Sequence, residues 1–319
     1  LHLERPHWET TVWVNGKKAG SHMSLSTPHV YDLTGLISAG RQNLTIAVDN
    51  SINLNVGPNS HSISDHTQGN WNGIVGDLML YATDLVWVND VQVYPDFEDK
   101  SARVLVTIGN KTGLEVVGEL SLKTKTGGVV AGEFEIAGEL ITVELTLPLG
   151  RGFETWDEFN PVLHELQVDL RSESGEMDSH SVNFGIRKIA TDGTQFTING
   201  RPVFLRGTLE CAIFPKTGHP ATDVDEWKRI IKVCKDYGLN HMRFHSWCPP
   251  EAAFLAADEL GFYFQVECAS WANGGVTIGD GNPIDEWLYA EGERITKAYG
   301  NHPSFVLMAY GNEPGGKQR

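Results

Sequence analysis

The sequence predicts two antiparallel β-sandwiches followed by the first half of a parallel (β/α)8 barrel, and two patterns carry this prediction. Short alternating apolar runs with glycine-rich turns fill about the first 187 residues, as in antiparallel sandwiches. From about residue 188, strand-like runs alternate with helical segments, as a parallel β/α fold requires. We therefore expect domains at residues 1–89, 90–187 and 188–319.

The composition limits the kinds of partner that the protein can have. The chain has 319 residues, of which 40% are hydrophobic and 21% charged, which is ordinary for a globular protein. Its formal charge of −16 and the lack of a basic run argue against a nucleic-acid partner. No apolar run reaches about 18 residues, so we expect no membrane insertion. The chain opens at Leu1 without a signal peptide, but a leader could have been removed, and the periplasm or extracellular space is favoured over the cytoplasm.

The first region, residues 1–89, is predicted to form short antiparallel strands. The Asn15-Gly16 pair lies between two strand-like runs and is typical of a tight hairpin turn. His61, His66 and Trp71 could line a sugar site, or could belong to a loop that packs against the next domain. The two histidines could also pair on a metal, but no further ligand follows at a convincing spacing. The strand-like runs lie at residues 11–14, 43–48 and 78–81.

The second region is predicted to form an immunoglobulin-like sandwich that acts as a spacer. A run from Val91 opens it, and later runs at residues 103–108, 119–124 and 141–146 alternate cleanly. The Gly127-Gly128 pair stands where a hairpin should turn. The region has no cysteine. The four cysteines of the chain lie in its last third without a Cys-x-x-Cys pair, and we expect free thiols.

The last region alternates strands with helices. Asp223 and Glu226 form a capping pair at a helix start, and Gly261 follows the next helix as a stop signal. The predicted strands lie at residues 203–207, 240–245, 262–267 and from 305 onward. A complete barrel needs roughly 250 residues and this region has about 130, so we expect half of one.

Polar residues follow the last of these strands. The apolar run of residues 305–310 is continuous, as in a strand that is buried on both faces. It ends at Gly311, and Asn312, Glu313 and Pro314 follow. In a (β/α)8 barrel the chemistry lies at this end of the strands, whereas the three residues alone could equally form a solvated turn. The ends of the second and third strands provide further candidates: Arg243, His245, Trp247, Glu267 and Trp271.

Asn301-His302-Pro303-Ser304 and Asn312-Glu313-Pro314 together resemble the acid/base signature of glycoside hydrolase family 2. This family contains β-galactosidases, β-glucuronidases and β-mannosidases. The resemblance implies a retaining, exo-acting glycosidase with a jelly-roll sugar-binding domain, here partial, then an immunoglobulin-like sandwich and a TIM barrel. It implies that Glu313 is the general acid/base and that Asn312 contacts the sugar 2-hydroxyl. The family's nucleophile is a glutamate at the end of strand 7, which would lie beyond Arg319.

The resemblance also suggests roles for the other strand-end residues. Arg243 matches the strand-2 arginine that orients the nucleophile, although it could instead form a structural ion pair with Glu267. Glu267 matches the acidic residue that follows strand 3. His245 and Trp247 lie where the family has Ser-His-Tyr-Pro, but one residue out of register. Trp271 could form a stacking wall for a sugar or could pack in the core.

Two departures from the family pattern concern specificity. The family's β-galactosidases have Arg-Gly-Val-Asn followed by histidines, whereas this chain has Arg206-Gly207-Thr208-Leu209-Glu210. The glutamate and histidine that hold magnesium in those enzymes are unmatched in Cys268-Ala269-Ser270-Trp271. We therefore expect no metal and no other cofactor, and these departures argue against β-galactosidase specificity.

Two other functions remain open at this point. One is a non-catalytic carbohydrate-binding protein, although a relic barrel would have no need to keep Glu313. The other is a glycosidase of a different TIM-barrel family that shares Asn-Glu-Pro, against which the two preceding sandwiches count. In each case the partner is an oligosaccharide or glycoside. We expect the 319 residues to be inactive alone and also consider a homo-oligomer, because half a barrel leaves edges and an apolar surface uncovered.

Overall fold

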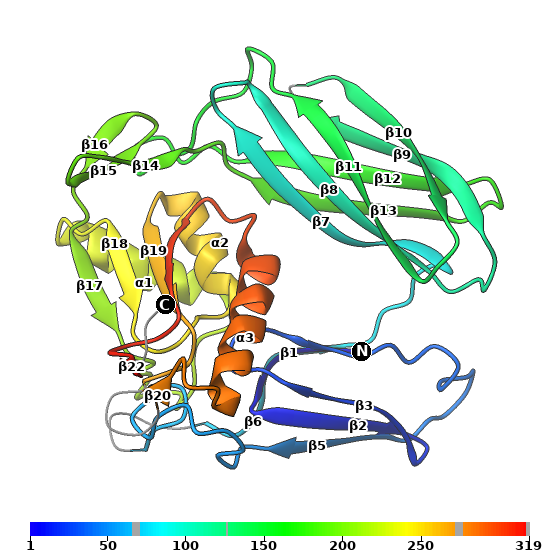
Figure 1. The fold of residues 1–319 in the computed structure, drawn as a ribbon, viewed down its shortest axis with the longest axis horizontal. Helices are drawn as coiled ribbons and strands as arrows, with labels where there is room; N and C mark the ends of the chain where they lie inside the picture. The colour runs from blue at the N-terminus through cyan, green and yellow to red at the C-terminus, as the bar shows by residue number, and fades with distance from the viewer. Residues whose placement is uncertain (66–70, 126, 272–276, 317–319) are drawn as a thin grey trace.

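The computed structural model describes residues 1–65, 71–125, 127–271 and 277–316, so His66 lies outside the described part. Figure 1 shows three bodies: a pair of small sheets that contains the N-terminus, a larger β-sandwich, and a parallel sheet with its helices. Within the described ranges, no helix has the length and apolar character needed to cross a bilayer.

The first body consists of two three-stranded antiparallel sheets, ordered β4-β1-β6 and β3-β2-β5. The hairpin predicted at Asn15-Gly16 is confirmed, because both residues have positive φ and join two paired strands. Leu3, Val12 and Tyr31 belong to the core between these sheets. The strands are β1 (His2–His7), β2 (Glu9–Val14), β3 (Lys17–Met23), β4 (His29–Val30), β5 (Leu44–Asp49) and β6 (Gly73–Met79).

The second body is a seven-stranded antiparallel sandwich with sheet orders β11-β8-β7 and β10-β9-β12-β13. The inward-facing residues of both sheets form one apolar core, as the alternating pattern predicts. The strand expected to open at Val91 starts earlier, at Val86, because Val86 already pairs with Asn110. The strands are β7 (Val86–Asp96), β8 (Ser101–Asn110), β9 (Val116–Thr124), β10 (Val129–Ile136), β11 (Leu140–Pro148), β12 (His164–Ser172) and β13 (Met177–Phe184).

A three-stranded antiparallel unit connects the sandwich to the parallel sheet. It consists of β14 (Ile189–Asp192), β15 (Gln195–Ile198) and β16 (Arg201–Val203). The expectation that the first parallel strand covers residues 203–207 is wrong, because Val203 pairs with Phe196 inside this unit. The first parallel strand is β17 (Gly207–Glu210), which begins where Gly207 aligns with His241.

The third body is a four-stranded parallel sheet in the order β17-β18-β19-β21, with helices between successive strands. Asp223 caps the first helix by accepting the Glu226 amide, and Gly261 ends the second in the left-handed conformation, as predicted. All four cysteines are free thiols, as expected. The elements are α1 (Val224–Asp236), β18 (His241–Phe244), α2 (Glu251–Leu260), β19 (Tyr263–Glu267), β20 (Thr277–Ile278), α3 (Pro283–Tyr299), β21 (Phe305–Ala309) and β22 (Gly315–Gly316).

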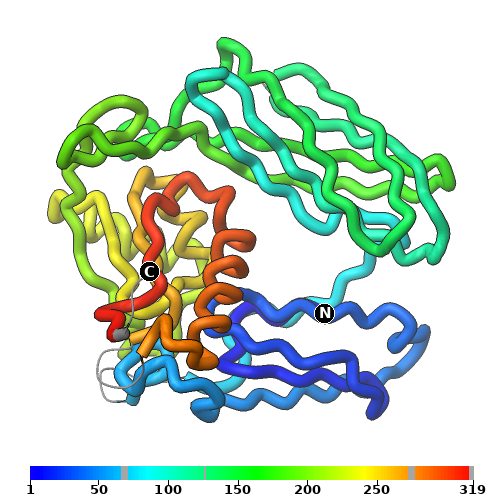
Figure 2. Tube along the Cα trace, viewed as in Figure 1, coloured from blue at the N-terminus to red at the C-terminus, as the bar shows by residue number. Residues whose placement is uncertain are grey.

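The first body packs directly on the parallel sheet through a shared core. Trp8, Val56 and Trp71 lie in the same apolar cluster as Trp227 and Phe244. The loop of residues 56–64 reaches the segments that follow the parallel strands, as the tube in Figure 2 shows. Residues from the first body are therefore close enough to take part in any site at this end of the sheet.

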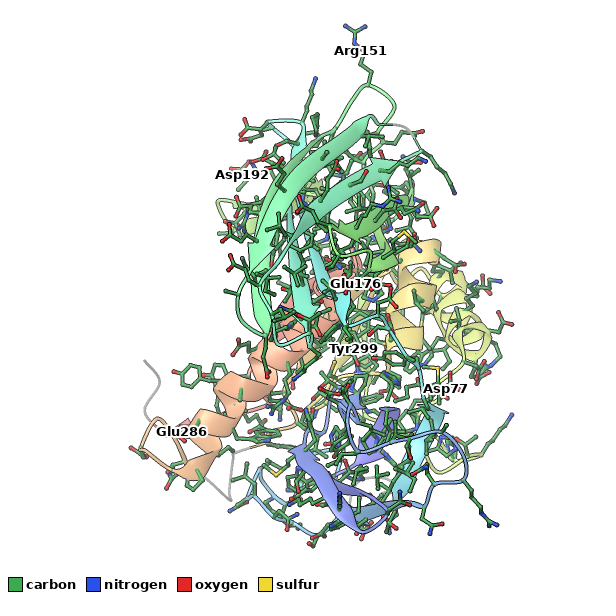
Figure 3. The ribbon with its side chains drawn as sticks, turned by 90° about the vertical axis from the view of Figure 1, so that its right-hand side faces the viewer. Asp77, Arg151, Glu176, Asp192, Glu286 and Tyr299 are labelled. Carbon is green, nitrogen blue, oxygen red and sulfur yellow. The ribbon has the colours of Figure 1, made fainter. Side chains whose placement is uncertain are left out.

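Helix α3 and the chain that follows it join all three bodies. Figure 3 shows α3 extending from Glu286, at its outer end, to Tyr299, where the three bodies meet. The Tyr299 hydroxyl donates to the carbonyl oxygen of Ser26 at 3.1 Å. The buried Glu291 carboxylate accepts the amide of Leu25 at 3.0 Å and pairs with Arg294. In the second body, Nε2 of Gln92 donates to the carbonyl oxygen of Lys297 at 2.8 Å, so α3 contacts both other bodies.

Candidate active site

Three side chains from successive parallel strands are joined by hydrogen bonds at the carboxyl end of the sheet. Nε of Arg243 donates to Oε1 of Glu267 at 2.7 Å, and its NH2 group donates to Oδ1 of Asn312 at 2.8 Å. The other oxygen of Glu267 accepts the amide of Ser246 at 2.7 Å. Glu267 and Asn312 are buried. The alternative ion pair between Arg243 and Glu267 is thus formed, and it includes Asn312 as well.

Glu313 lies beside this group, and its side chain is exposed. Its Oε2 accepts the indole N–H of Trp271 at 2.9 Å. The backbones of Trp271 and Asn312 form a parallel bridge, and the Asn312 amide donates to the carbonyl oxygen of Ser270 at 2.8 Å. After Glu313, β22 pairs with β20, so the chain is held on both sides of the carboxylate.

Strained backbone is concentrated at this end of the sheet. Ala212, Ser246 and Glu313 follow β17, β18 and β21 closely, and each has φ between 42 and 55° although none is a glycine. Non-glycine residues adopt this left-handed region at a cost, and such residues are enriched at functional sites. The position of these three residues therefore favours a functional site here.

Aromatic rings form a wall beside Glu313. The ring of Trp271 meets the ring of His245 at a centroid distance of 4.7 Å and the ring of His61 at 5.5 Å, both edge to face. His61 comes from the loop of the first body: its amide binds Oγ of Ser246, and its Nδ1 lies 2.9 Å from the His245 carbonyl oxygen. Burial lowers the pKa of both histidines.

Trp247 lies apart from this wall. Its side chain is completely buried in the apolar core. There it packs edge to face against Phe244, with 5.4 Å between the ring centroids. Its indole N–H donates to the carbonyl oxygen of Glu210 at 3.3 Å. Trp247 is therefore a core residue that hydrogen-bonds to the end of β17. The other sequence candidates lie together at the carboxyl end of the sheet: Arg243, His245, Glu267, Trp271, Asn312 and Glu313.

Two family models match this chain. The model for glycosyl hydrolases family 2 matches residues 86–187, and the model for the TIM barrel domain of the same family matches residues 189–319. The chain belongs to glycoside hydrolase family 2.

Similar proteins with known names are longer than this chain. A β-galactosidase of Thermoanaerobacter pseudethanolicus is 28% identical over 88% of this chain, and the match covers 38% of that protein. The structure of β-glucuronidase 2 of Bacteroides uniformis is similar over 98% of this chain and 38% of its own, with a TM-score of 0.81 and 21% identity. That of a family 2 β-galacturonidase of Eisenbergiella tayi, bound to galacturonate, covers 98% and 55%, with a TM-score of 0.78 and 19% identity. The chain spans 30–38% of the length of the curated relatives it matches.

The segment after β19 can be compared with the magnesium ligands of family 2 β-galactosidases over its described residues, 268–271. In the described part of the chain, no three His, Cys, Asp or Glu side chains converge as metal ligands would. The segment after β19 offers the buried thiol of Cys268, whose pKa is raised by burial to about 12, and then Ala269, Ser270 and Trp271. A thiol that keeps its proton is a poor ligand for a hard cation. The indole N–H of Trp271, in the same segment, donates a hydrogen bond to Glu313.

Glu210 is a further carboxyl group at the end of a parallel strand. It is the last residue of β17, and its carboxylate accepts the amides of Ala212 at 3.0 Å and Ile213 at 3.4 Å. Burial raises its pKa to about 7. Because both oxygens face its own loop, this carboxyl organises the turn in which Ala212 adopts positive φ.

The sequence left two environments open for His61, a sugar site or a loop that packs against the next domain, and the structure shows the packed loop. His61 belongs to a loop that packs on the barrel segments, and its ring also lies beside the wall formed by His245 and Trp271. The only sequence signal was an aromatic cluster in a loop, which could not show which strand ends the loop would reach. That contact depends on how the first body docks.

Proposed function

We propose that this protein is part of a retaining, exo-acting family 2 glycosidase that removes a terminal β-linked sugar, with Glu313 as general acid/base. In this proposal the first body is a partial jelly roll, the second is an immunoglobulin-like sandwich, and the parallel sheet is the first half of a (β/α)8 barrel. The substrate is an oligosaccharide or glycoside that ends in a β-linked hexose or hexuronic acid. The names of its relatives, β-galactosidase, β-glucuronidase and β-galacturonidase, support this range.

The main support for this proposal is the side-chain amide of Asn312. Its Oδ1 is held by Arg243, whereas its Nδ2 is buried and has no hydrogen-bond partner among the described residues. A buried donor without a partner costs about 1–3 kcal/mol, so the site is arranged to receive an acceptor. A sugar 2-hydroxyl next to Glu313 would supply one, as the family 2 pattern implies. A solvated turn after a strand would not bury and orient an amide in this way.

Retention of configuration needs a second carboxyl group about 5–5.5 Å from the acid/base. Glu267 is unsuited to this role, because Arg243 and the Ser246 amide occupy both of its oxygens. We place the nucleophile beyond Arg319, on a later strand of the barrel. Glu313 then protonates the leaving oxygen as the nucleophile attacks the anomeric carbon. In the second step the Glu313 carboxylate takes a proton from the water that releases the sugar.

The deciding experiment replaces Glu313 in the complete enzyme. Glu313→Gln should lower turnover of substrates with poor leaving groups by about 10²–10⁴, while activated aryl glycosides should lose much less, because they need little protonation. Glu293→Gln is the matched control: Glu293 is an exposed glutamate on α3, and its replacement should change neither rate. Equal losses on both substrate types would contradict the assignment. A complete protein that binds glycosides but hydrolyses none would favour the carbohydrate-binding alternative.

A further inference from the structure

The indole of Trp271 is bonded to the carboxylate that we assign as the acid/base. Its Nε1–H donates to Oε2 of Glu313 at 2.9 Å, and its backbone bridges to Asn312. An indole N–H can only donate, so it binds a lone pair of Oε2, and an unprotonated carboxyl oxygen is the better acceptor for it. The bond therefore makes the two oxygens of Glu313 inequivalent.

The first body contacts Trp271 closely. Its amide donates to the carbonyl oxygen of Val56 at 2.8 Å. Gly57, with φ of +97°, packs so closely that a Cβ there would lie 1.8 Å from the Trp271 carbonyl oxygen. On the other side, the rings of His61 and His245 meet the indole edge to face. Backbone and ring contacts together fix the direction of the indole N–H.

We propose that Trp271 is a positioning residue for the acid/base: its indole N–H holds Oε2 of Glu313 and so orients the carboxyl group that transfers the proton. This inference rests on the proposed function. The bond also persists when Glu313 is ionised, and it is stronger then, because hydrogen bonds to charged acceptors exceed those to neutral ones. Trp271 thus stabilises the carboxylate that must act as base in the second step.

The test compares the complete enzyme with its Trp271→Phe variant, which keeps an aromatic ring but lacks the N–H group. For substrates with poor leaving groups we expect kcat to fall about tenfold with KM little changed, because the carboxyl is no longer held. The basic limb of the kcat/KM profile should move upward by about one pH unit, since the ionised form has lost a donor. A residue that merely packs would not move this limb.

The matched control is Trp87→Phe in the second body. The Trp87 indole N–H donates to Oδ1 of Asn89 at 3.3 Å, so the same chemical group and one side-chain hydrogen bond are lost within β7. The pH profile of this control should equal that of the unmodified enzyme. An unmoved basic limb in Trp271→Phe would overturn the role of Trp271, while the leaving-group dependence of Glu313→Gln would still stand. Should Glu313→Gln show no such dependence, the proposed function itself fails.

A second readout requires neither turnover nor a variant of Trp271. In the indole N–H spectrum of the unmodified protein, one resonance should titrate with Glu313. This titration should vanish in Glu313→Gln and persist in Glu293→Gln. A spectrum in which no indole resonance depends on Glu313 would show that the bond does not form, and would overturn the proposal even if Trp271→Phe failed to fold.

Discussion

Nδ1 of His302 lies 2.6 Å from Oδ2 of Asp258, in a buried pair that ties the start of β21 to the last turns of α2. The other Asp258 oxygen accepts the amide of Ser304 at 3.0 Å. Next to it, Asn301 exchanges hydrogen bonds with the backbone of Val91 and Val93 in the second body. The Asn-His-Pro-Ser part of the signature therefore positions the strand that presents Asn312 and Glu313.

This pair predicts a pH-dependent contribution to stability. Burial lowers the pKa of His302, but the Asp258 carboxylate more than offsets this and leaves the pKa above its ordinary value. The contribution is therefore complete below about pH 6.5 and is lost as pH rises through the raised pKa. His302→Gln should cost most unfolding free energy near pH 6 and progressively less at higher pH, as measured by urea titrations.

His7 gives the opposite sign and serves as the control for this measurement. Burial lowers its pKa to about 4, so it favours the unfolded chain as pH falls from about 6.5. His7→Gln should therefore cost least at acidic pH. Parallel pH trends in the two variants would contradict the assignment of His302 as the group with the raised pKa.

We predict that Asn312 acts through the 2-hydroxyl in the transition state. Asn312→Ala in the complete enzyme should lower kcat more than it raises KM, at a cost of about 2–4 kcal/mol. A 2-deoxy substrate lacks the hydroxyl and should be insensitive to the change. If kcat for the 2-deoxy sugar falls as much as for the parent, the contact lies elsewhere on the substrate.

Arg243 should act partly through Asn312. Arg243→Lys keeps the charge but cannot maintain two directed hydrogen bonds to Glu267 and Asn312, so we expect kcat/KM to fall by about 10-fold to 100-fold. The double variant with Asn312→Ala should lose less than the sum of the two single losses, because the residues share one bond. Additive losses in this cycle would show that the arginine acts independently of the amide.

The 319-residue chain alone should be inactive and should self-associate. Leu209 and Tyr310, on the outer two strand segments of the parallel sheet, are 51% and 46% exposed. Open strand edges with apolar side chains drive association, and our proposal places the nucleophile beyond Arg319. Light scattering and a panel of aryl β-glycosides would test both points. A monomer that hydrolyses any of these substrates would refute this prediction and our placement of the nucleophile.

Most local features of this chain could be predicted because they depend on neighbouring residues. The Asn15-Gly16 turn, the Asp223 cap and the Gly261 stop follow from backbone preferences and short-range hydrogen bonds. The start of the first parallel strand was misplaced, because Val203 fits either a hairpin or a barrel strand. Only its pairing with Phe196 decides between them.

The sequence by itself determined the succession of antiparallel β regions and a β/α region, the family, and the placement of Asn312 and Glu313 at the end of a parallel strand, because these depend on periodicity and on the order of motifs along the chain. Only the tertiary structure decided which side chains meet there. Trp247, one of the sequence candidates, is in the core, while the indole of Trp271 bonds to Glu313. The physical reason is that this contact depends on residues 56–64 packing against a segment about 210 positions away in the chain. Local sequence preferences cannot predict which residues meet across such a separation.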